Sequence, residues 1–297
     1  MIFDSIVRMF SRPNWKLAVR EFKNNEDLRI IDYEELVYKP LKLKGDYWCA
    51  DPFICSDHNH LYVFFECYLK GKQKGVIAVG EYTDGSISGI RVIIEQDYHM
   101  SYPCVFKDKT AFYMIPETSD NRTIELYRSN DFPDGWELIK VLQEDIRCVD
   151  TTVFSYDNNL YALGYLLNSQ KICLFNLDLS NLTLTKLEEI TAIDRPAGNI
   201  INFQGRLIRP IQVSKRKYGD GIVFKEIVSL KNGHFQEHKL SGVQGQDIRV
   251  EGESKIHRVH TFNRINQVEI IDYSKDSFDL IRPVRLIKSR LTGKACW

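Results

Sequence analysis

The feature that most constrains the fold of this sequence is a short pattern that recurs at long intervals. A strand-like run reaches a polar turn and is followed by a second strand-like run, which is the signal of a β-hairpin. These hairpins begin near residues 51, 102, 150, 195 and 259. Repetition at about this period is typical of a β-propeller, in which each blade is one four-stranded sheet.

The runs themselves support this interpretation. The first hairpin reads ADPFI and LYVFF around a four-residue loop, Asp57–His60, and the second reads YPCVF and AFYMI around KDKT. DTTVF and LYALGY form the third, while the fourth turns at Gln204-Gly205 and the fifth, which is weaker, at RINQ. Two more strand-like runs follow each hairpin, such as VIAVGEY and ISGIRVIIE. The sequence therefore predicts an all-β protein, a single five-bladed β-propeller domain spanning residues 1–297.

The two ends of the chain are expected to close the ring. Trp15–Phe22 and Leu28–Leu36 would complete the last blade beside Leu280–Ile287, which removes the exposed sheet edges that promote aggregation. Residues 1–14 are expected to form a helix or tail, whose apolar side chains suit either packing or peripheral contact with a membrane surface. The alternative fold is a pair of β-sandwiches, but the chain lacks the Pro/Gly/Ser-rich linker that two domains would need.

Propeller geometry brings distant residues together. The first strand of each blade lines the central channel, so residues that start first strands and end second strands converge at one mouth. The starts are Asp51, Tyr102, Asp150, Arg195 and His260, with Trp48 and His99 just upstream, and the ends are Glu66, Glu117, Gln212 and Arg209. Ionisable groups gathered in a concave site are where perturbed pKa values and chemistry are expected.

Several of these residues also have structural interpretations. Asp51 precedes Pro52 and can cap a turn, because aspartate accepts backbone N–H groups at such positions. Glu117 can be a solvated carboxylate at a strand end, and Glu66 can orient a neighbour. His260 can be a core histidine with satisfied hydrogen bonds. The recurrence of aspartate at Asp150 favours a functional role for Asp51.

A basic segment stands apart from the acidic one. Basic side chains predominate between Arg195 and Lys225, and acidic side chains between Glu117 and Asp157. Arginine matches phosphate geometry, so a basic rim facing carboxylates suggests a phosphorylated or pyrophosphorylated ligand. Arg195 and Arg209 each precede a proline beside an apolar strand, which predicts a place near the mouth. Lys215 and Lys217 fit an ordinary solvated loop.

Composition excludes several classes of protein. The chain has 40 basic and 40 acidic side chains, which gives no overall attraction to nucleic acid. Its 7 cysteines are scattered without a C-x-x-C pair, which fits free thiols in a reducing compartment. No apolar run is long enough for a transmembrane helix, and the N-terminus lacks a signal-peptide cleavage site. We therefore expect a cytoplasmic protein, with peripheral contact at the inner membrane face as an option.

Two resemblances follow from these residues. Ala50-Asp51-Pro52-Phe53 resembles the first blade of the five-bladed glycoside hydrolases of families 43, 62 and 32, where this aspartate is the catalytic base or nucleophile. The second blade departs from that pattern, because Ser101-Tyr102-Pro103 stands where family 43 carries a supporting aspartate. A closer likeness covers residues 45–275, above all the segment with IPETS, N-R and E-L-Y-R between residues 112 and 138. It is similar to the N-terminal propeller of plant glucosamine inositolphosphorylceramide transferases, which also occurs in bacterial surface-polysaccharide loci.

Three functions remain open at this point. The first is a glycosyltransferase of bacterial surface-polysaccharide assembly, with an activated and possibly furanosyl sugar donor and a glycan or glycolipid acceptor. The second is a family 43 hydrolase, with Asp51 and Glu117 as its two carboxyl groups. The third is a propeller that binds glycans without catalysis, stacking them on Trp48, Tyr102 and Tyr218.

The first function assigns a role to each group. Asp51 would be the general base on the acceptor hydroxyl, and Asp150 or Glu117 would orient the acceptor. The arginines expected to hold the departing phosphate are Arg195, Arg209, Arg122 and Arg216. No cofactor is expected and no metal site is assigned, although a divalent metal that shares the leaving-group charge is compatible with the sequence.

Overall fold

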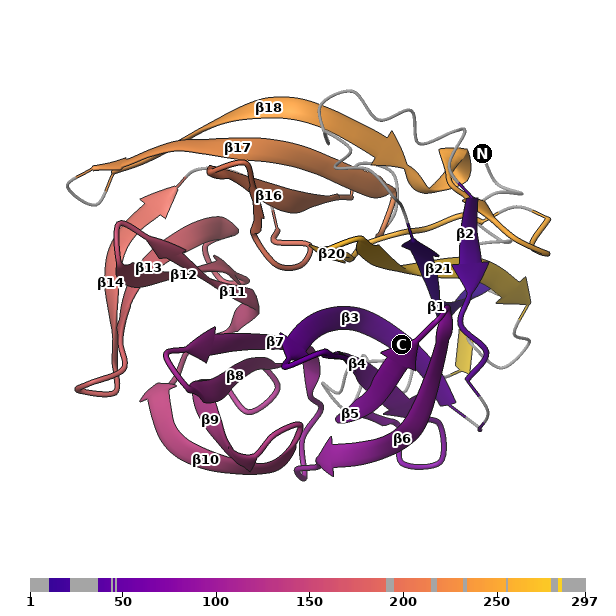
Figure 1. Ribbon diagram of the computed structural model, residues 1–297, viewed down its shortest axis with the longest axis horizontal. Helices are drawn as coiled ribbons and strands as arrows, with labels where there is room; N and C mark the ends of the chain where they lie inside the picture. Colours follow the sequence, from indigo (N-terminus) through magenta and orange to yellow (C-terminus); the bar gives the residue numbers. More distant parts are fainter. Residues whose placement is uncertain are drawn as a thin grey trace.

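The computed structural model describes residues 11–21, 37–43, 45, 47–190, 195–214, 218–231, 234–254, 256–278 and 283–284. In this part of the chain, five β-sheets surround a central axis (Figure 1). The five-bladed β-propeller that the repeats predict is confirmed. No helix of the described residues is long and apolar enough to cross a membrane.

The first three blades follow the predicted repeat closely, each with four consecutive antiparallel strands. Blade one contains β3 (Tyr47–Asp57), β4 (His60–Leu69), β5 (Lys74–Thr83) and β6 (Ser86–Ile94). Blade two contains β7 (Ser101–Asp108), β8 (Ala111–Thr118), β9 (Thr123–Asp131) and β10 (Asp134–Gln143). Blade three contains β11 (Cys148–Tyr156), β12 (Asn159–Leu166), β13 (Lys171–Asp178) and β14 (Thr183–Ile190).

The last two blades are less regular. Blade four contains β15 (Ile201–Phe203), β16 (Arg206–Val213), β17 (Gly221–Lys231) and β18 (His234–Gln244), followed by a short 3₁₀ helix, Gly245–Asp247. Blade five has the order β19 (Arg249–Val250), β2 (Val37–Pro40), β1 (Ser11–Glu21), β21 (Val268–Phe278) and β20 (Phe262–Ile265), so both ends of the chain contribute strands.

The N-terminal strand closes the ring, but with a different partner from the one expected. β1 pairs antiparallel with β21, from Ser11 opposite Phe278 to Glu21 opposite Val268. The predicted partner, Leu280–Ile287, therefore begins beyond the strand that is used. Residues 11–14 belong to β1 and not to a helix or tail, while residues 1–10 and Leu28–Leu36 lie outside the described part.

A buried ion cluster fastens this closure. Glu269 of β21 is fully buried and accepts hydrogen bonds from Arg20 Nε of β1 at 2.9 Å and Arg264 Nε of β20 at 2.8 Å. The hydroxyl of Tyr38, from β2, donates to the same carboxylate at 2.9 Å. Four strands of blade five thus meet at one side chain, and the paired charges compensate for its burial.

The hairpin turns are tighter than the sequence indicated. Asp57 pairs with His60, Asp108 with Ala111 and Tyr156 with Asn159, which leaves two-residue turns. Such turns suit the right-handed twist of the strands better than four-residue loops do.

Burial follows position in the blade. The inner strands are covered on both sides, as in β3, whereas the outer strands β6 and β14 are largely exposed. One apolar cluster, which includes Phe53 and Met114, joins blades one to three, and another, which includes Phe224 and Phe262, joins blades four and five. The ring is therefore packed between its blades, and this holds the inner strands in fixed positions.

The first strands of blades one, two and three share a local irregularity at the same place. Between Ala50 and Phe53, two residues of β3 lie opposite one residue of β4, and the same β-bulge occurs in β7 and β11. At the bulge, φ is +49° at Asp51, +46° at Tyr102 and +55° at Asp150. Non-glycine residues rarely adopt this conformation, and it is concentrated at functional sites. The repeated bulge re-aims these three side chains.

Candidate active site

The ends of the inner strands surround one small cavity at the centre of the ring. Its volume is about 40 Å³, which is room for a few water molecules. The cavity is lined by Trp15, Trp48, Ala50, Asp51, Glu66, His99, Ser101, Glu117, Asp150, Arg195, Tyr218 and His260. These residues come from all five blades, so the convergence expected from the repeats is present. We call this space the axial cavity.

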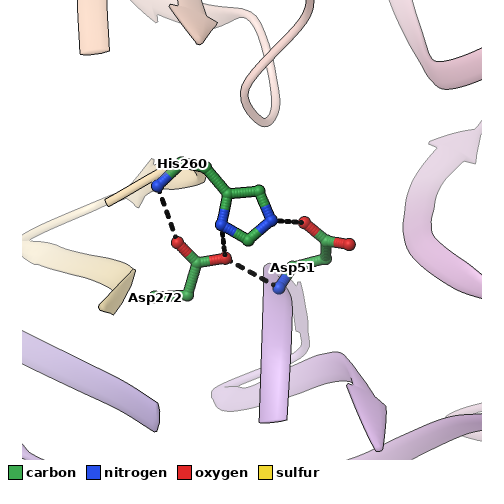
Figure 2. A group of neighbouring side chains, drawn as sticks. All are labelled: Asp51, His260 and Asp272. Atoms are coloured by element: carbon green, nitrogen blue, oxygen red, sulfur yellow. Dashed lines mark hydrogen bonds and ion pairs between the residues drawn. The ribbon is translucent and has the colours of Figure 1, made fainter. Parts of the chain in front are cut away.

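Asp51 and His260 form the most elaborate contact in the axial cavity. Figure 2 shows the imidazole of His260 between two carboxylates. Its Nε2 lies 3.1 Å from Asp51 Oδ1, and its Nδ1 lies 2.8 Å from Asp272 Oδ2. All three side chains are buried. The second oxygen of Asp51 points away from His260 (Figure 2).

Backbone and side-chain donors hold the two aspartates in place. Oδ1 of Asp272 accepts the backbone N–H groups of His260 at 3.0 Å and Thr261 at 2.9 Å, and Oδ2 accepts that of Asp51 at 3.0 Å. The hydroxyl of Thr261 donates to Asp51 Oδ1 at 2.8 Å. Asp272 therefore ties blade five to the bulge of blade one, and Asp51 has little freedom to rotate.

The contacts between His260 and the two aspartates also determine the protonation states of His260 and Asp51. Burial disfavours an imidazolium, but the carboxylates of Asp272 and Asp51 outweigh it and raise the pKa of His260 to about 10. Burial also acts to raise the pKa of Asp51, yet His260, Thr261 and Arg195 lower it overall. At neutral pH the axial cavity thus holds an ionised Asp51 beside a cationic His260.

Asp51, His260 and Asp272 also have the donor types of a metal site. The two carboxylates, however, contact opposite nitrogens of the imidazole, Asp51 at Nε2 and Asp272 at Nδ1, whereas a histidine binds one metal ion through one nitrogen. Both oxygens of Asp272 already accept backbone N–H groups. This arrangement fits a proton-bearing histidine better than a metal ion.

A second ion pair lies across the axial cavity. Nε of Arg195 lies 2.6 Å from Asp150 Oδ2, and its guanidinium carbon lies 5.5 Å from the ring centre of Tyr218. Burial raises the pKa of Asp150 in spite of Arg195. Burial, together with the nearby charge of Asp150, raises the pKa of Glu117 to about 8. Glu117, whose Oε1 accepts the hydroxyl of Ser119 at 2.9 Å, is therefore protonated near neutral pH.

The remaining wall of the axial cavity comes from blade one and from the segment before β7. Trp48 stacks on Tyr68 with ring centres 4.6 Å apart, and Nε2 of His99 lies 3.4 Å from Glu66 Oε1. The backbone N–H of Gly75 donates to Nδ1 of His99 at 2.9 Å, which leaves the proton of a neutral His99 on Nε2. Burial raises the pKa of Glu66 and lowers that of His99, so it favours the neutral form of both side chains.

Some predicted residues lie elsewhere. Arg209 lies along the face of blade four, opposite Lys225, and binds Glu237 at 2.8 and 2.9 Å. It is three positions before Gln212, where β16 reaches the end of the blade. Gln212 is buried, and its backbone N–H donates to the carbonyl of Arg195, but it does not line the axial cavity.

Tyr102 and Arg122 are also displaced from the axial cavity. Tyr102 shares the bulge position of Asp51, but its buried side chain does not line the axial cavity. Its hydroxyl accepts the backbone N–H of Gly198 at 2.6 Å and contacts Thr152 at 2.8 Å. The turn between β8 and β9 leaves Arg122 exposed, 3.4 Å from Asp145. Arg216 lies outside the described residues.

Two important residues of the candidate active site, Asp272 and Trp15, could not be identified by the sequence analysis. Asp272 is an acid inside the apolar run Ile270–Tyr273, and an isolated charge in a buried strand is the signal that could have found it. Trp15, whose ring centre lies 4.1 Å from that of His260, reaches the axial cavity only because β1 closes the ring. No local motif marks it.

Fold and site together define a class: a five-bladed propeller with ionisable and aromatic side chains gathered at its axis. The profile of one family, described as glucosamine inositolphosphorylceramide transferase 1, N-terminal, matches residues 44–275. This chain belongs to that family.

Glucosamine inositolphosphorylceramide transferase 1 of Oryza sativa subsp. indica is 29% identical over 203 residues, which are 63% of this chain and 27% of the rice protein. The Arabidopsis thaliana protein of the same name is 29% identical over 117 residues, 39% of this chain and 15% of that protein. The chain thus spans about a quarter or less of these relatives.

Solved structures show the same fold at low sequence identity. An exo-β-1,3-galactanase from Phanerochaete chrysosporium aligns with a TM-score of 0.55 at 10% identity, over 88% of this chain and 64% of that one. The catalytic domain of a family GH62 α-L-arabinofuranosidase from Coprinopsis cinerea also gives 0.55 at 10% identity, over 91% and 99%. These likenesses show a shared propeller fold.

Proposed function

We propose that this chain is a glycosyltransferase that uses an activated sugar donor at the axial cavity. The observation that carries the proposal is a pair of unlike carboxyl groups that line the same cavity. His260 and Thr261 contact Asp51 and lower its pKa, whereas burial raises the pKa of Glu117 to about 8. Two carboxyl groups with separated pKa values supply a base and an acid at the same pH. The family relationship supports transfer, since the named relatives are transferases.

Each of these side chains then has a role in the transfer reaction. Asp51 accepts the proton of the acceptor hydroxyl as the acceptor oxygen bonds to the anomeric carbon. The bond from that carbon to the donor's phosphate oxygen breaks, and its electron pair leaves with the phosphate. Arg195 and His260 are the cations at the axial cavity that stabilise the developing negative charge. Glu117 donates a hydrogen bond or a proton on the leaving-group side.

The donor and acceptor extend this proposal. We place the reaction in bacterial surface-polysaccharide assembly, in the cytoplasm and at the inner membrane face, with a glycan or glycolipid acceptor. A furanosyl donor is the first to test, because the related fold includes an arabinofuranosidase; this is an analogy of fold.

The test is direct. The protein is incubated with a panel of nucleotide-activated sugars, furanosyl and pyranosyl, and a synthetic lipid-linked acceptor, and products are sought by mass spectrometry. Asp51→Asn should lower turnover by about 10²–10⁴-fold, the usual contribution of a general base. Asp57→Asn is the matched control, since Asp57 is the last residue of β3 and does not line the axial cavity. Equal turnover by Asp51→Asn and wild type would refute the role of Asp51.

A family 43 type hydrolase is the second candidate, and the same separation of pKa values favours it. Hydrolysis also needs one ionised and one protonated carboxyl beside the scissile bond. Release of free sugar from neutral aryl glycosides, lost in both Asp51→Asn and Glu117→Gln, would establish hydrolysis instead of transfer. Sugar binding that survives Asp51→Asn, with no product of either kind, would establish a binding propeller.

A further inference from the structure

Two buried cysteines lie directly opposite each other in blade one. Cys49 of β3 is the register partner of Cys67 of β4, and both are free thiols. Directly opposite residues of an antiparallel pair point to the same face of the sheet. Their Cα atoms are about 4.5 or 5.5 Å apart, depending on the type of pair, and a disulfide needs about 4.4–6.8 Å. The backbone therefore holds these two residues, which we call the thiol pair, at a distance that a disulfide can bridge.

The other described cysteines lack such a partner in their own sheets. Cys55 and Cys104 each lie opposite a residue other than cysteine. Cys148 of β11 and Cys173 of β13 are separated by β12, and two strand spacings amount to roughly 9–10 Å. A disulfide cannot join Cα atoms more than about 7 Å apart without movement of the backbone. The thiol pair is therefore distinct among the cysteines of the described residues.

The two thiols also interact with each other. The hydrogen bond from Cys49 lowers the pKa of the Cys67 thiol, whereas burial, together with the same bond, raises the pKa of Cys49. The thiolate is the form of cysteine that attacks an oxidant. Cys67 is thus the nucleophile of the thiol pair, and Cys49 is the resolving thiol beside it.

A small oxidant has a route to the thiol pair. Cys49 lines a cavity of about 490 Å³ between blade five and blade one, together with residues such as Leu17 of β1 and Tyr47 of β3. A water molecule occupies about 30 Å³ in the liquid, so this cavity admits a molecule as small as hydrogen peroxide.

The thiol pair lies behind the blade-one wall of the axial cavity. Successive residues of a strand point to opposite faces, and the neighbours Trp48, Ala50 and Glu66 line the axial cavity. The thiol pair itself belongs to an apolar cluster that includes Leu17 of β1 and Ile270 of β21. A bond within the thiol pair therefore joins β3 to β4 immediately beside the bulge of β3.

We propose that the thiol pair is a site of reversible oxidation, which a hydroperoxide converts to a disulfide. The Cys67 thiolate attacks one oxygen of hydrogen peroxide, the O–O bond breaks, and the other oxygen leaves as hydroxide, which takes up a proton to form water. The resulting sulfenic acid is attacked by the sulfur of Cys49, and its oxygen leaves with the thiol proton as a second water. The two thiols together lose two electrons, and the peroxide gains two. This inference goes beyond the proposed function and does not depend on it.

The test is made on the folded full chain. The protein is treated with hydrogen peroxide, the excess is removed with catalase, and the remaining thiols are alkylated in urea before proteolysis and mass spectrometry. Alkylation of Cys49 and Cys67 should fall at least about tenfold, because a paired thiolate reacts ahead of buried neutral thiols, and a peptide joined through both residues should appear. The other described cysteines should be alkylated as in untreated protein. Dithiothreitol should restore both thiols.

Two variants and the wild type decide the outcome. Cys67→Ala should abolish the joined peptide, and Cys55→Ala should leave it unchanged, since Cys55 is buried in the same strand opposite Tyr62. Full alkylation of the thiol pair after peroxide treatment, or a sulfinic acid there without a joined peptide, would overturn the proposal. A joined peptide that forms only when peroxide is added in urea would overturn it as well. The wild-type measurement is decisive even if a variant fails to fold.

Discussion

Nε2 of His260 lies 3.1 Å from Oδ1 of Asp51, and this contact joins blade five to the bulge of blade one at the centre of the ring. Because His260 also lies 2.8 Å from Asp272, one imidazolium compensates two buried carboxylates. The stability of the ring and the ionisation of Asp51 therefore depend on the same residue.

Replacing His260 should destabilise the protein strongly. In His260→Gln, Asp51 and Asp272 remain buried without their cation, and removing one partner of a buried pair costs about 3–5 kcal/mol. Urea unfolding measures the difference. The control is His238→Gln, since His238 is 53% exposed where it contacts Glu226, and should change the free energy of unfolding little. Similar values for the two variants would contradict the assigned role.

The contribution of His260 should also depend on pH. Its pKa is about 10 in the folded protein and 6.5 as the reference value, so the folded state binds the proton more tightly. The stabilisation is fully present below about pH 6.5 and is lost as the pH rises through about 10. The difference in unfolding free energy between wild type and His260→Gln should therefore shrink from pH 7 to pH 10. A constant difference would mean that His260 is neutral.

Glu117 should show a pH dependence of the same sign, but over a lower pH range. Its folded pKa is about 8 and its reference value is 4.5, so ionisation between these pH values favours the unfolded state. Glu117→Gln should gain stability relative to wild type as the pH rises from about 4.5 to 8. If Glu117 is the acid of the reaction, wild-type turnover also falls above about pH 8, and this alkaline limb is absent from Glu117→Gln. A pH-independent difference in stability would show that Glu117 is ionised throughout.

Gly75 should be required for the blade-one wall of the axial cavity. A Cβ at this position would lie 2.4 Å from the carbonyl oxygen of Met100 and 2.5 Å from Glu66 Oε1. Gly75→Ala must therefore displace β5 or Glu66, with an expected loss of about 1–3 kcal/mol from overpacking. Gly71→Ala is the control, because its Cβ would meet nothing within 4 Å. Thermal unfolding of both variants, compared at one pH, tests the difference.

Local signals explain why so much of the fold could be predicted. Each hairpin carries its own turn and apolar pattern, so Asp51, Glu117 and Asp150 could be predicted to converge, and all three line the axial cavity. The strand starts were less accurate, because β3 begins at Tyr47 and not at Asp51. Long-range choices could not be made in this way. Leu280–Ile287 and Val268–Phe278 both mix apolar and polar side chains, so their composition does not decide between them, and β1 pairs with the second.

The direction of a side chain was the other property that could not be predicted from the sequence. Arg209 and Arg195 both precede prolines, yet one binds Glu237 on the blade face and the other reaches the axis. The difference depends on register within the blade, which the sequence does not mark. Asp272 was missed for a related reason, since its role as an acceptor for residues of two blades exists only after the ring closes.

The positive-φ position repeated in the first three blades has a consequence for how such rings diversify. Asp51, Tyr102 and Asp150 occupy corresponding positions of their blades, with similar positive φ values and different side chains. Because the backbone there already tolerates an aspartate, a phenol or another aspartate, one codon change can add or remove a carboxylate at the axis without rebuilding a strand. Related rings can thus exchange one chemistry for another while they keep the same frame.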